Sequence, residues 1–242
     1  MLHLPRELLF IIFQYLDLPE LLNLMSCCTT LQDFVEYFFP MDWTDIMDLQ
    51  DQGPLHMSTL QWVVRKKSAL VESLCARELP IVKDIPASLN SVLGEWRGDR
   101  LTVLALNHQS VAVLDFLRCM PSLRELDLHG CRNLGDHSLP SLSQVPSLRE
   151  LNIGDNFNVT GQGLVAGHLP TSLEALYCEG PMLSACQVDI ICVALPVLEY
   201  LTLSVVPGEE AKDALRRRRA EGMKILLLKW NYDKRMGSGV YF

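Results

Sequence analysis

Leucines beyond residue 100 recur in the pattern Leu-x-x-Leu-x-Leu at a nearly constant interval. The pattern begins at Leu101, Leu123, Leu148, Leu173, Leu198 and Met223, with separations of 22 and then four times 25 residues. Alternating apolar positions predict a strand with one buried face. Prolines stand shortly before four of these strands, where they end a preceding helix, at positions 121, 146, 170 and 196. We therefore predict about six strand–turn–helix repeats over residues 101–242, stabilised by stacking on one another.

The N-terminal segment has a different, helical pattern. From Leu4 to Val35, 19 of 32 residues are apolar, counting Leu, Ile, Val, Phe, Tyr, Met and Cys. Pro5 suits a first helical position, and Asp17-Leu18-Pro19 separates the first helix from the second. One face of the first helix carries Leu8, Leu9, Ile12, Phe13 and Leu16. Phe10 and Ile11 fill the opposite side, so this helix is apolar all round and needs burial on more than one side. A unit of this size rarely builds a sufficient core alone, so it should cover the rest of the chain or another protein.

Residues 41–100 are less regular. Apolar positions near Trp62 and between residues 85 and 96 predict helices, and residues 71–76 can form a degenerate first repeat. We interpret this stretch as a helical connector between residues 1–40 and 101–242. The expected fold class is α/β, with three N-terminal helices followed by a solenoid of parallel strands on its concave side and helices on its convex side.

The N-terminal spacing resembles an F-box, the three-helix motif that docks on the Skp-type adaptor of cullin–RING ubiquitin ligases. The resemblance runs from Leu4-Pro5 to Cys28, with Leu31 where the family often has Trp. It implies adaptor contacts from ten residues, some of which must instead pack inside the unit: Leu4, Pro5, Leu8, Leu9, Ile12, Phe13, Leu16, Leu21, Leu22 and Leu24.

The repeats resemble the leucine-rich-repeat family, in particular its cysteine-containing branch. Cys131 and Asn156 occupy the ninth place of their repeats, where the side chain satisfies loop backbone groups. The third, fifth and seventh places should face the concave side. They supply the candidate target-binding residues Glu125, Asp127, His129, Glu150, Asn152, Tyr177, Glu179, Tyr200 and Thr202, followed by a last row of Ile225, Leu227 and Lys229. This face grades from acidic to apolar, which suggests a target with a basic segment beside an apolar one.

Composition narrows the function classes. The formal net charge of −8 disfavours nonspecific binding to nucleic acid or anionic membranes. Eight cysteines without a CxxC pair favour free thiols in a reducing compartment, cytoplasmic or nuclear. We expect no signal or transit segment, membrane span, metal site or cofactor, and no catalytic constellation, because the six histidines are scattered. The basic run at residues 216–219 is better explained as a solvated helical face than as a localisation signal.

The sequence alone leaves two functions open. The family resemblances imply a non-catalytic substrate-recognition subunit of an SCF-type ubiquitin ligase, which would bind the adaptor and a target protein and so promote ubiquitination and degradation of that target. The alternative is a leucine-rich scaffold whose first helices only cap the solenoid. Complete packing of Phe10 and Ile11 inside the chain would favour the scaffold.

Overall fold

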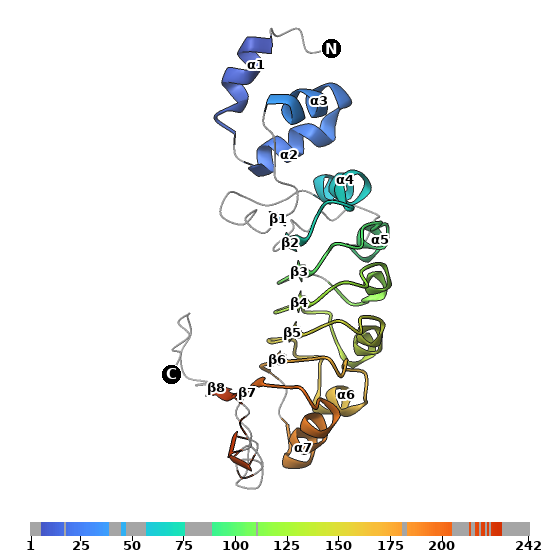
Figure 1. The fold of residues 1–242 in the computed structure, drawn as a ribbon, viewed down its shortest axis with the longest axis vertical. Coiled ribbons are helices and arrows are strands. Elements are labelled where there is room, and N and C mark those ends of the chain that lie inside the picture. The colour runs from blue at the N-terminus through green and yellow to red at the C-terminus, as the bar shows by residue number, and fades with distance from the viewer. Residues whose placement is uncertain are drawn as a thin grey trace.

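The structure is a computed structural model of the 242-residue chain. It describes residues 6–16, 18–38, 45–46, 57–75, 89–109, 111–180 and 183–204, and near the C-terminal end residues 213, 216–217, 219–220, 222 and 224–228. Helices α1 to α3 stand at one end of an elongated, curved molecule, and a single parallel sheet runs along the rest (Figure 1). The predicted mixed α/β fold with a parallel sheet is confirmed.

Three helices form the N-terminal unit: α1 (Arg6–Phe13), α2 (Leu18–Cys27) and α3 (Thr29–Phe38). The rings of Phe13 and Phe34 meet edge to face with centroids 5.4 Å apart. Around them lie buried apolar side chains from all three helices: Leu9, Leu21, Met25, Leu31 and Val35. This apolar contact, which no single helix could supply, holds the unit together.

In the described part of the chain, eight strands form the sheet in chain order, each paired in parallel with the next. They are β1 (Asp45–Ile46), β2 (Ser73–Cys75), β3 (Val103–Ala105), β4 (Glu125–Asp127), β5 (Glu150–Asn152), β6 (Ala175–Cys178), β7 (Tyr200–Ser204) and β8 (Lys224–Leu228). The central leucines stack in register, from Leu104 through Leu126, Leu151 and Leu176 to Leu201, and all five are buried. One buried leucine column therefore runs through five successive repeats.

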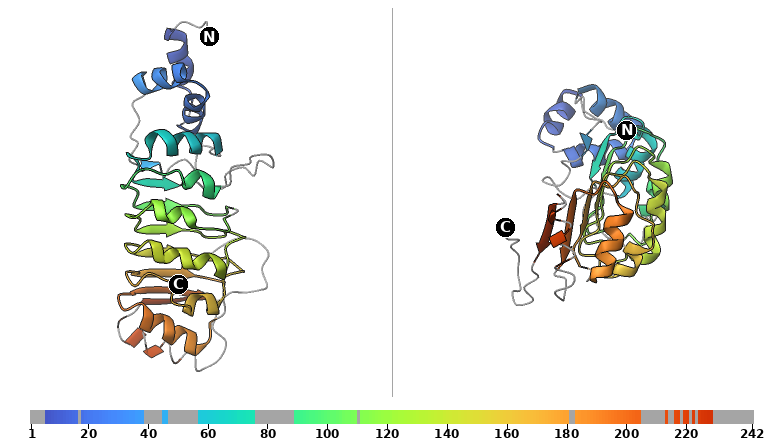
Figure 2. Two further views of the ribbon diagram at one scale, coloured as in Figure 1. Left: turned by 90° about the vertical axis from the view of Figure 1, so that its right-hand side faces the viewer. Right: turned by 60° about the horizontal axis from the view of Figure 1, so that its bottom comes forward.

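Helical segments cover the convex face of the sheet and leave its concave face uncovered by helices (Figures 1 and 2). They are α4 (Met57–Lys67), α5 (Leu89–Leu93), η2 (Asp115–Cys119), η3 (Asp136–Gln144), α6 (Gly161–Val165) and α7 (Ala185–Ala194). Both η2 and η3 are 3-10 helices. The narrower 3-10 turn suits short connections, and it still places Leu139 and Leu142 in the core.

The sheet extends upstream of residue 101. Strand β2 pairs with β3, with Leu74 opposite Leu104, and β1 pairs with β2. The region expected as a helical connector thus adds two strands to the sheet as well as helices α4 and α5. The boundaries at residues 40 and 100 stay predictions.

The last predicted row of the concave face was wrong by one residue. In the observed register Lys224 pairs with Tyr200, whereas Ile225 and Leu227 pair with the leucines at 201 and 203. The final interval is therefore one residue shorter than the preceding repeats suggest. Lys229 lies outside the described residues.

The ninth-place prediction is confirmed. Asn156 is fully buried, and its Nδ2 donates to the carbonyl oxygens of Leu128 (2.9 Å), Ile153 (2.9 Å) and Gly154 (3.1 Å). The Cys131 thiol donates to the Leu106 carbonyl at 3.0 Å, and burial raises its pKa to about 11. That thiol is protonated at neutral pH and acts as a hydrogen-bond donor between neighbouring repeats.

Helix α4 joins the N-terminal unit to the part of the chain that carries the sheet. Lys67 Nζ lies 2.7 Å from Glu36 Oε1, and this hydrogen bond is the main cause that lowers the pKa of Glu36. Thr59 Oγ1 on α4 donates to Asn23 Oδ1 on α2. Buried Leu60 and Val63 belong to the same continuous core as the side chains of α2 and α3. Polar and apolar contacts together fix the orientation of the helical unit on the first solenoid helix.

Candidate functional site

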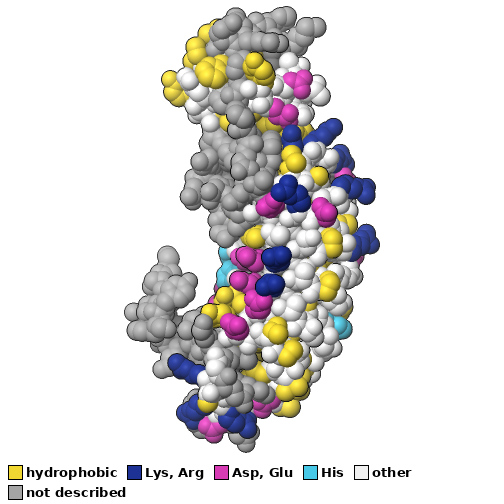
Figure 3. Space-filling model, viewed as in Figure 1, with side chains coloured by type: hydrophobic (Ala, Val, Ile, Leu, Met, Phe, Trp, Pro, Cys, Tyr) yellow, Lys and Arg dark blue, Asp and Glu magenta, His cyan; other side chains and the backbone are white. Residues whose placement is uncertain are grey.

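A row of exposed apolar side chains lies on α1 and the turn after it. Leu8, Ile11, Ile12 and Tyr15 are all exposed, with 46% of Leu8 and 47% of Ile12 open to solvent. Their spacing of three, one and three residues places them on one helical face, which we call the α1 stripe. Hydrophobic side chains gather at this end of the molecule in Figure 3. Contiguous exposed apolar surface of this kind marks a site of protein interaction.

The ten predicted adaptor contacts divide between this surface and the interior. Leu8 and Ile12 are exposed, whereas Leu9, Phe13 and Leu21 are buried in the helical unit. Leu16 and Leu24 are half-buried against the same core. Leu4 and Pro5 lie outside the described residues, and the side chain of Leu22 is not described.

Sequence reasoning missed part of the stripe. Ile11 and Tyr15 were not among the predicted contacts, because the pattern joined residues 8, 9, 12, 13 and 16 into one face. The available signal was the apolar character of Phe10 and Ile11 on the other side. Both are exposed in the structure, so the condition that favours a simple capping scaffold is not met.

The second candidate surface is the concave face of the sheet. One column runs Glu125, Glu150, Ala175 and Tyr200 across β4 to β7, and a second runs Asp127, Asn152, Tyr177 and Thr202. The strands bring together eight of the nine predicted target-binding residues as exposed or half-buried side chains. Thr202 differs, because only 5% of it is exposed, which leaves little of it for contact with a target.

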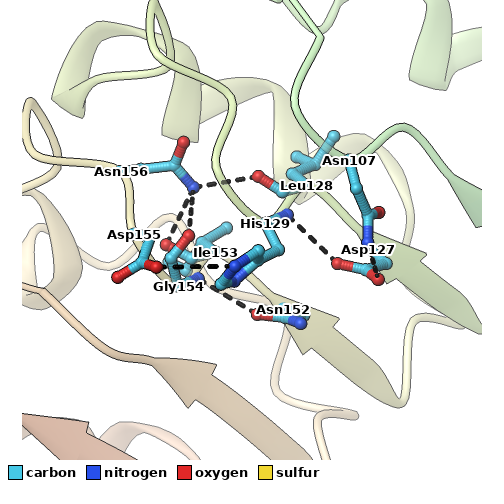
Figure 4. Close-up of polar contacts among 9 residues, drawn as sticks. All are labelled: Asn107, Asp127, Leu128, His129, Asn152, Ile153, Gly154, Asp155 and Asn156. Atoms are coloured by element: carbon cyan, nitrogen blue, oxygen red, sulfur yellow. Dashed lines mark hydrogen bonds and ion pairs between the residues drawn. The ribbon is translucent and has the colours of Figure 1, made fainter. Parts of the chain in front are cut away.

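Polar side chains at the ends of the strands form hydrogen bonds within the repeats (Figure 4). Asp127 accepts from the backbone N–H of His129 through Oδ1 (3.0 Å) and from Asn107 Nδ2 through Oδ2 (2.7 Å). Asn152 Oδ1 accepts from the Gly154 N–H at 3.0 Å in the same way. These fifth-place side chains therefore close the turn after the strand, which makes them less available to a partner than the third-place carboxylates.

A histidine and two carboxyl groups lie together beyond these turns. His129 Nε2 is 3.5 Å from Asp155 Oδ2, and the His108 ring meets the His129 ring edge to face at 5.5 Å. Burial and the neighbouring Asp155 raise the pKa of Glu179, while His129 acts in the opposite direction. Sequence reasoning missed Asn107 and Asp155 because it read only the third, fifth and seventh places of the later repeats.

Carboxyl groups on the concave face lie close enough to affect one another's pKa. Burial raises the pKa of Glu150, and the nearby carboxyl groups of Glu125 and Glu174 raise it further. The pKa of Tyr177 is raised by burial, then by Glu150, Tyr200 and Glu125. Neighbouring carboxyl groups thus lie beside the half-buried ring of Tyr177 and the exposed ring of Tyr200.

Other kinds of site were sought in the same part of the chain. Among the described residues, no three His, Cys, Asp or Glu side chains are grouped so that they could hold a metal ion. None of the described helices has the length and apolar character needed to span a bilayer.

Comparison with known proteins adds one family match. Residues 1–39 match the F-box domain family. Among solved structures, the chain is similar to internalin C2 of Listeria monocytogenes, with 16% identity, a TM-score of 0.45, and coverage of 87% of this chain and 92% of that one. No curated protein matches the chain significantly.

Proposed function

We propose that this chain is a substrate-recognition subunit of an SCF-type cullin–RING ubiquitin ligase. The three N-terminal helices form the F-box and dock on the Skp-type adaptor, and the leucine-rich-repeat solenoid binds the target protein. The observation that carries the proposal is the α1 stripe: four exposed apolar side chains on one helical face, inside the segment that matches the F-box domain family.

Burial of the α1 stripe supplies part of the free energy that docking requires. Covering one Leu or Ile side chain contributes roughly 1.5–3 kcal/mol when it passes from full exposure to full burial. Leu8 and Ile12 retain about half of their exposure, so each contributes about half of that range. Together with Ile11 and Tyr15 they supply several kcal/mol, and micromolar binding requires about 8 kcal/mol in total. The stripe is thus a principal part of the interface and not the whole of it.

The proposed role requires no chemistry from the chain itself. A target held on the concave face is kept near a charged ubiquitin-conjugating enzyme, which raises the effective concentration of its lysines. A stiff connection strengthens this effect because it limits the positions that the target can adopt. The ion pair between Lys67 and Glu36 and the shared core at α4 support such a connection.

The experiment is co-purification of the tagged chain from cells, with adaptor and cullin quantified by mass spectrometry. The paired change Leu8→Asp and Ile12→Asp should abolish recovery of both partners, since it places two charges in a desolvated apolar interface. A matched control is Leu70→Asp with Val113→Asp, because these residues are about equally exposed but lie on the solenoid. Full adaptor recovery with the α1 variant, or equal loss with both variants, would overturn the proposal.

A further inference from the structure

Two carboxylates stand directly opposite one another on the concave face. Glu125 on β4 and Glu150 on β5 occupy the same register position, and neighbouring strands are about 4.8 Å apart. Like charges in such positions destabilise a sheet. No described cation forms an ion pair with either carboxylate, and the nearby Arg149 instead pairs with Glu174 at 3.0 Å. The pair therefore places two like charges side by side, without an ion pair from a described residue to offset their repulsion.

Aromatic rings follow these carboxylates along the sheet. The next residue in the column is Ala175, which is 3% exposed and has only a methyl side chain, and after it comes the exposed Tyr200. Tyr177, two residues along β6, lies close enough for Glu150 and Glu125 to raise its pKa. A small residue is thus bordered by a carboxylate on one side and tyrosines on the other.

This combination fits a cationic side chain. Arginine or lysine can lie between two carboxylates, where charge-assisted hydrogen bonds are shorter and stronger than neutral ones. The face of a tyrosine ring attracts the same cation, and tyrosine is enriched among residues that dominate binding energy. An acidic or phosphorylated segment would be repelled by the same groups.

We propose that Glu125, Glu150, Tyr177 and Tyr200 form the recognition surface for an arginine- or lysine-bearing segment of a target protein. We call these four residues the carboxylate–tyrosine face. The cation lies between the two carboxylates, and the apolar part of its stem packs toward the tyrosine rings. This inference rests on the proposed function in one respect: it assumes that the solenoid is the target-binding part of the chain.

The test is selection of a randomised peptide library on the immobilised full chain. Selected peptides should be enriched in arginine or lysine. A selected peptide, fluorescently labelled, is then titrated against the wild type and the Glu125→Gln, Glu150→Gln double variant. The variant should bind about tenfold more weakly or worse, and Tyr177→Ala should also weaken binding. The control Asp99→Asn, Asp115→Asn removes two exposed charges elsewhere and should stay within about twofold of wild type.

Failure of the inference is recognisable in the same data. Selected peptides without basic residues, absence of any enrichment, or equal affinity for the double variant and the wild type would each overturn it. The double variant folds without the repulsion between the two carboxylates, so loss of structure does not explain weaker binding. Adaptor binding is measured in parallel. If the chain binds the adaptor but selects no basic peptides, only this inference is contradicted. If it selects basic peptides but does not bind the adaptor, only the ligase proposal is contradicted.

Discussion

Single buried polar residues hold neighbouring repeats together. Asn156 donates to three carbonyl oxygens, of which those of Leu128 and Gly154 also accept a backbone N–H, and Cys131 bridges to the preceding repeat through one. A carbonyl left unpaired in the interior costs roughly 1–3 kcal/mol. The ninth place is therefore a structural position, even where a cysteine there looks like a reactive group.

Replacing Asn156 with alanine should lower the free energy of unfolding by about 1–3 kcal/mol, because the Ile153 carbonyl loses its donor and the Leu128 and Gly154 carbonyls keep only a backbone N–H. Asn158→Ala is the matched control, since that side chain is exposed and donates once, to the Arg132 carbonyl. It should cost under about 1 kcal/mol. Urea denaturation measures both, and similar losses for the two variants would contradict this account of the ninth place.

Helix α1 shows how one element serves two purposes. Phe13 is buried against Phe34, while Ile12 next to it is about half exposed. The sequence could not divide these roles, because a helix that is apolar all round has no polar face to mark the solvent side. Only the packing of α2 and α3 decides which side is covered.

Truncating a side chain on the buried face of α1 should therefore lower stability, whereas truncating one on the exposed face should weaken adaptor binding. Phe13→Ala should destabilise the chain by about 3–5 kcal/mol, because it leaves a cavity in the helical unit. Ile12→Ala should change stability by under about 1 kcal/mol but weaken adaptor binding. Thermal unfolding and adaptor titration of the same two variants test this; a strong loss of stability in Ile12→Ala would place that residue in the core.

The paired strands β4 and β5 lead to a pH-dependent stability. Because burial and neighbouring carboxyl groups raise the pKa of Glu150 above its ordinary value of 4.5, the folded state holds this proton more tightly than the unfolded state. The free energy of unfolding contributed by this group is therefore highest below pH 4.5, and it falls as pH rises through the folded-state pKa.

Glutamine mimics the protonated acid, so Glu150→Gln should be no less stable than the wild type at about pH 4 and more stable at about pH 7. Melting temperatures of both proteins across this range give the measurement. Added salt should reduce the difference at pH 7, since part of it is repulsion between carboxylates near the surface. A difference in melting temperature that does not change with pH would contradict a raised pKa of Glu150 in the folded state.

At the scale of the whole molecule, repetition made most of the solenoid predictable. Each Leu-x-x-Leu-x-Leu segment from Leu101 to Leu198 lies at a strand, because alternate leucines can be buried only in that conformation. Where repetition weakens, prediction failed or fell short: the register of β8 was displaced by one residue, and β1 was not expected. A strand of two residues carries no periodicity that a sequence pattern could reveal.

The orientation of the helical unit could not be predicted either. It depends on contacts between segments distant in sequence, such as Asn23 with Thr59 and Glu36 with Lys67. Their result is an apolar helical surface at one end of the molecule and an acidic, aromatic sheet face along the concave side. Two separated surfaces of different chemistry are what a subunit needs when it links two different proteins.

The most direct test of this account is calorimetric titration of the purified Skp-type adaptor into the full chain at several temperatures. Burial of the α1 stripe predicts binding with a clearly negative heat-capacity change, the thermodynamic mark of apolar surface leaving water. No binding, or binding with a heat-capacity change near zero, would contradict it.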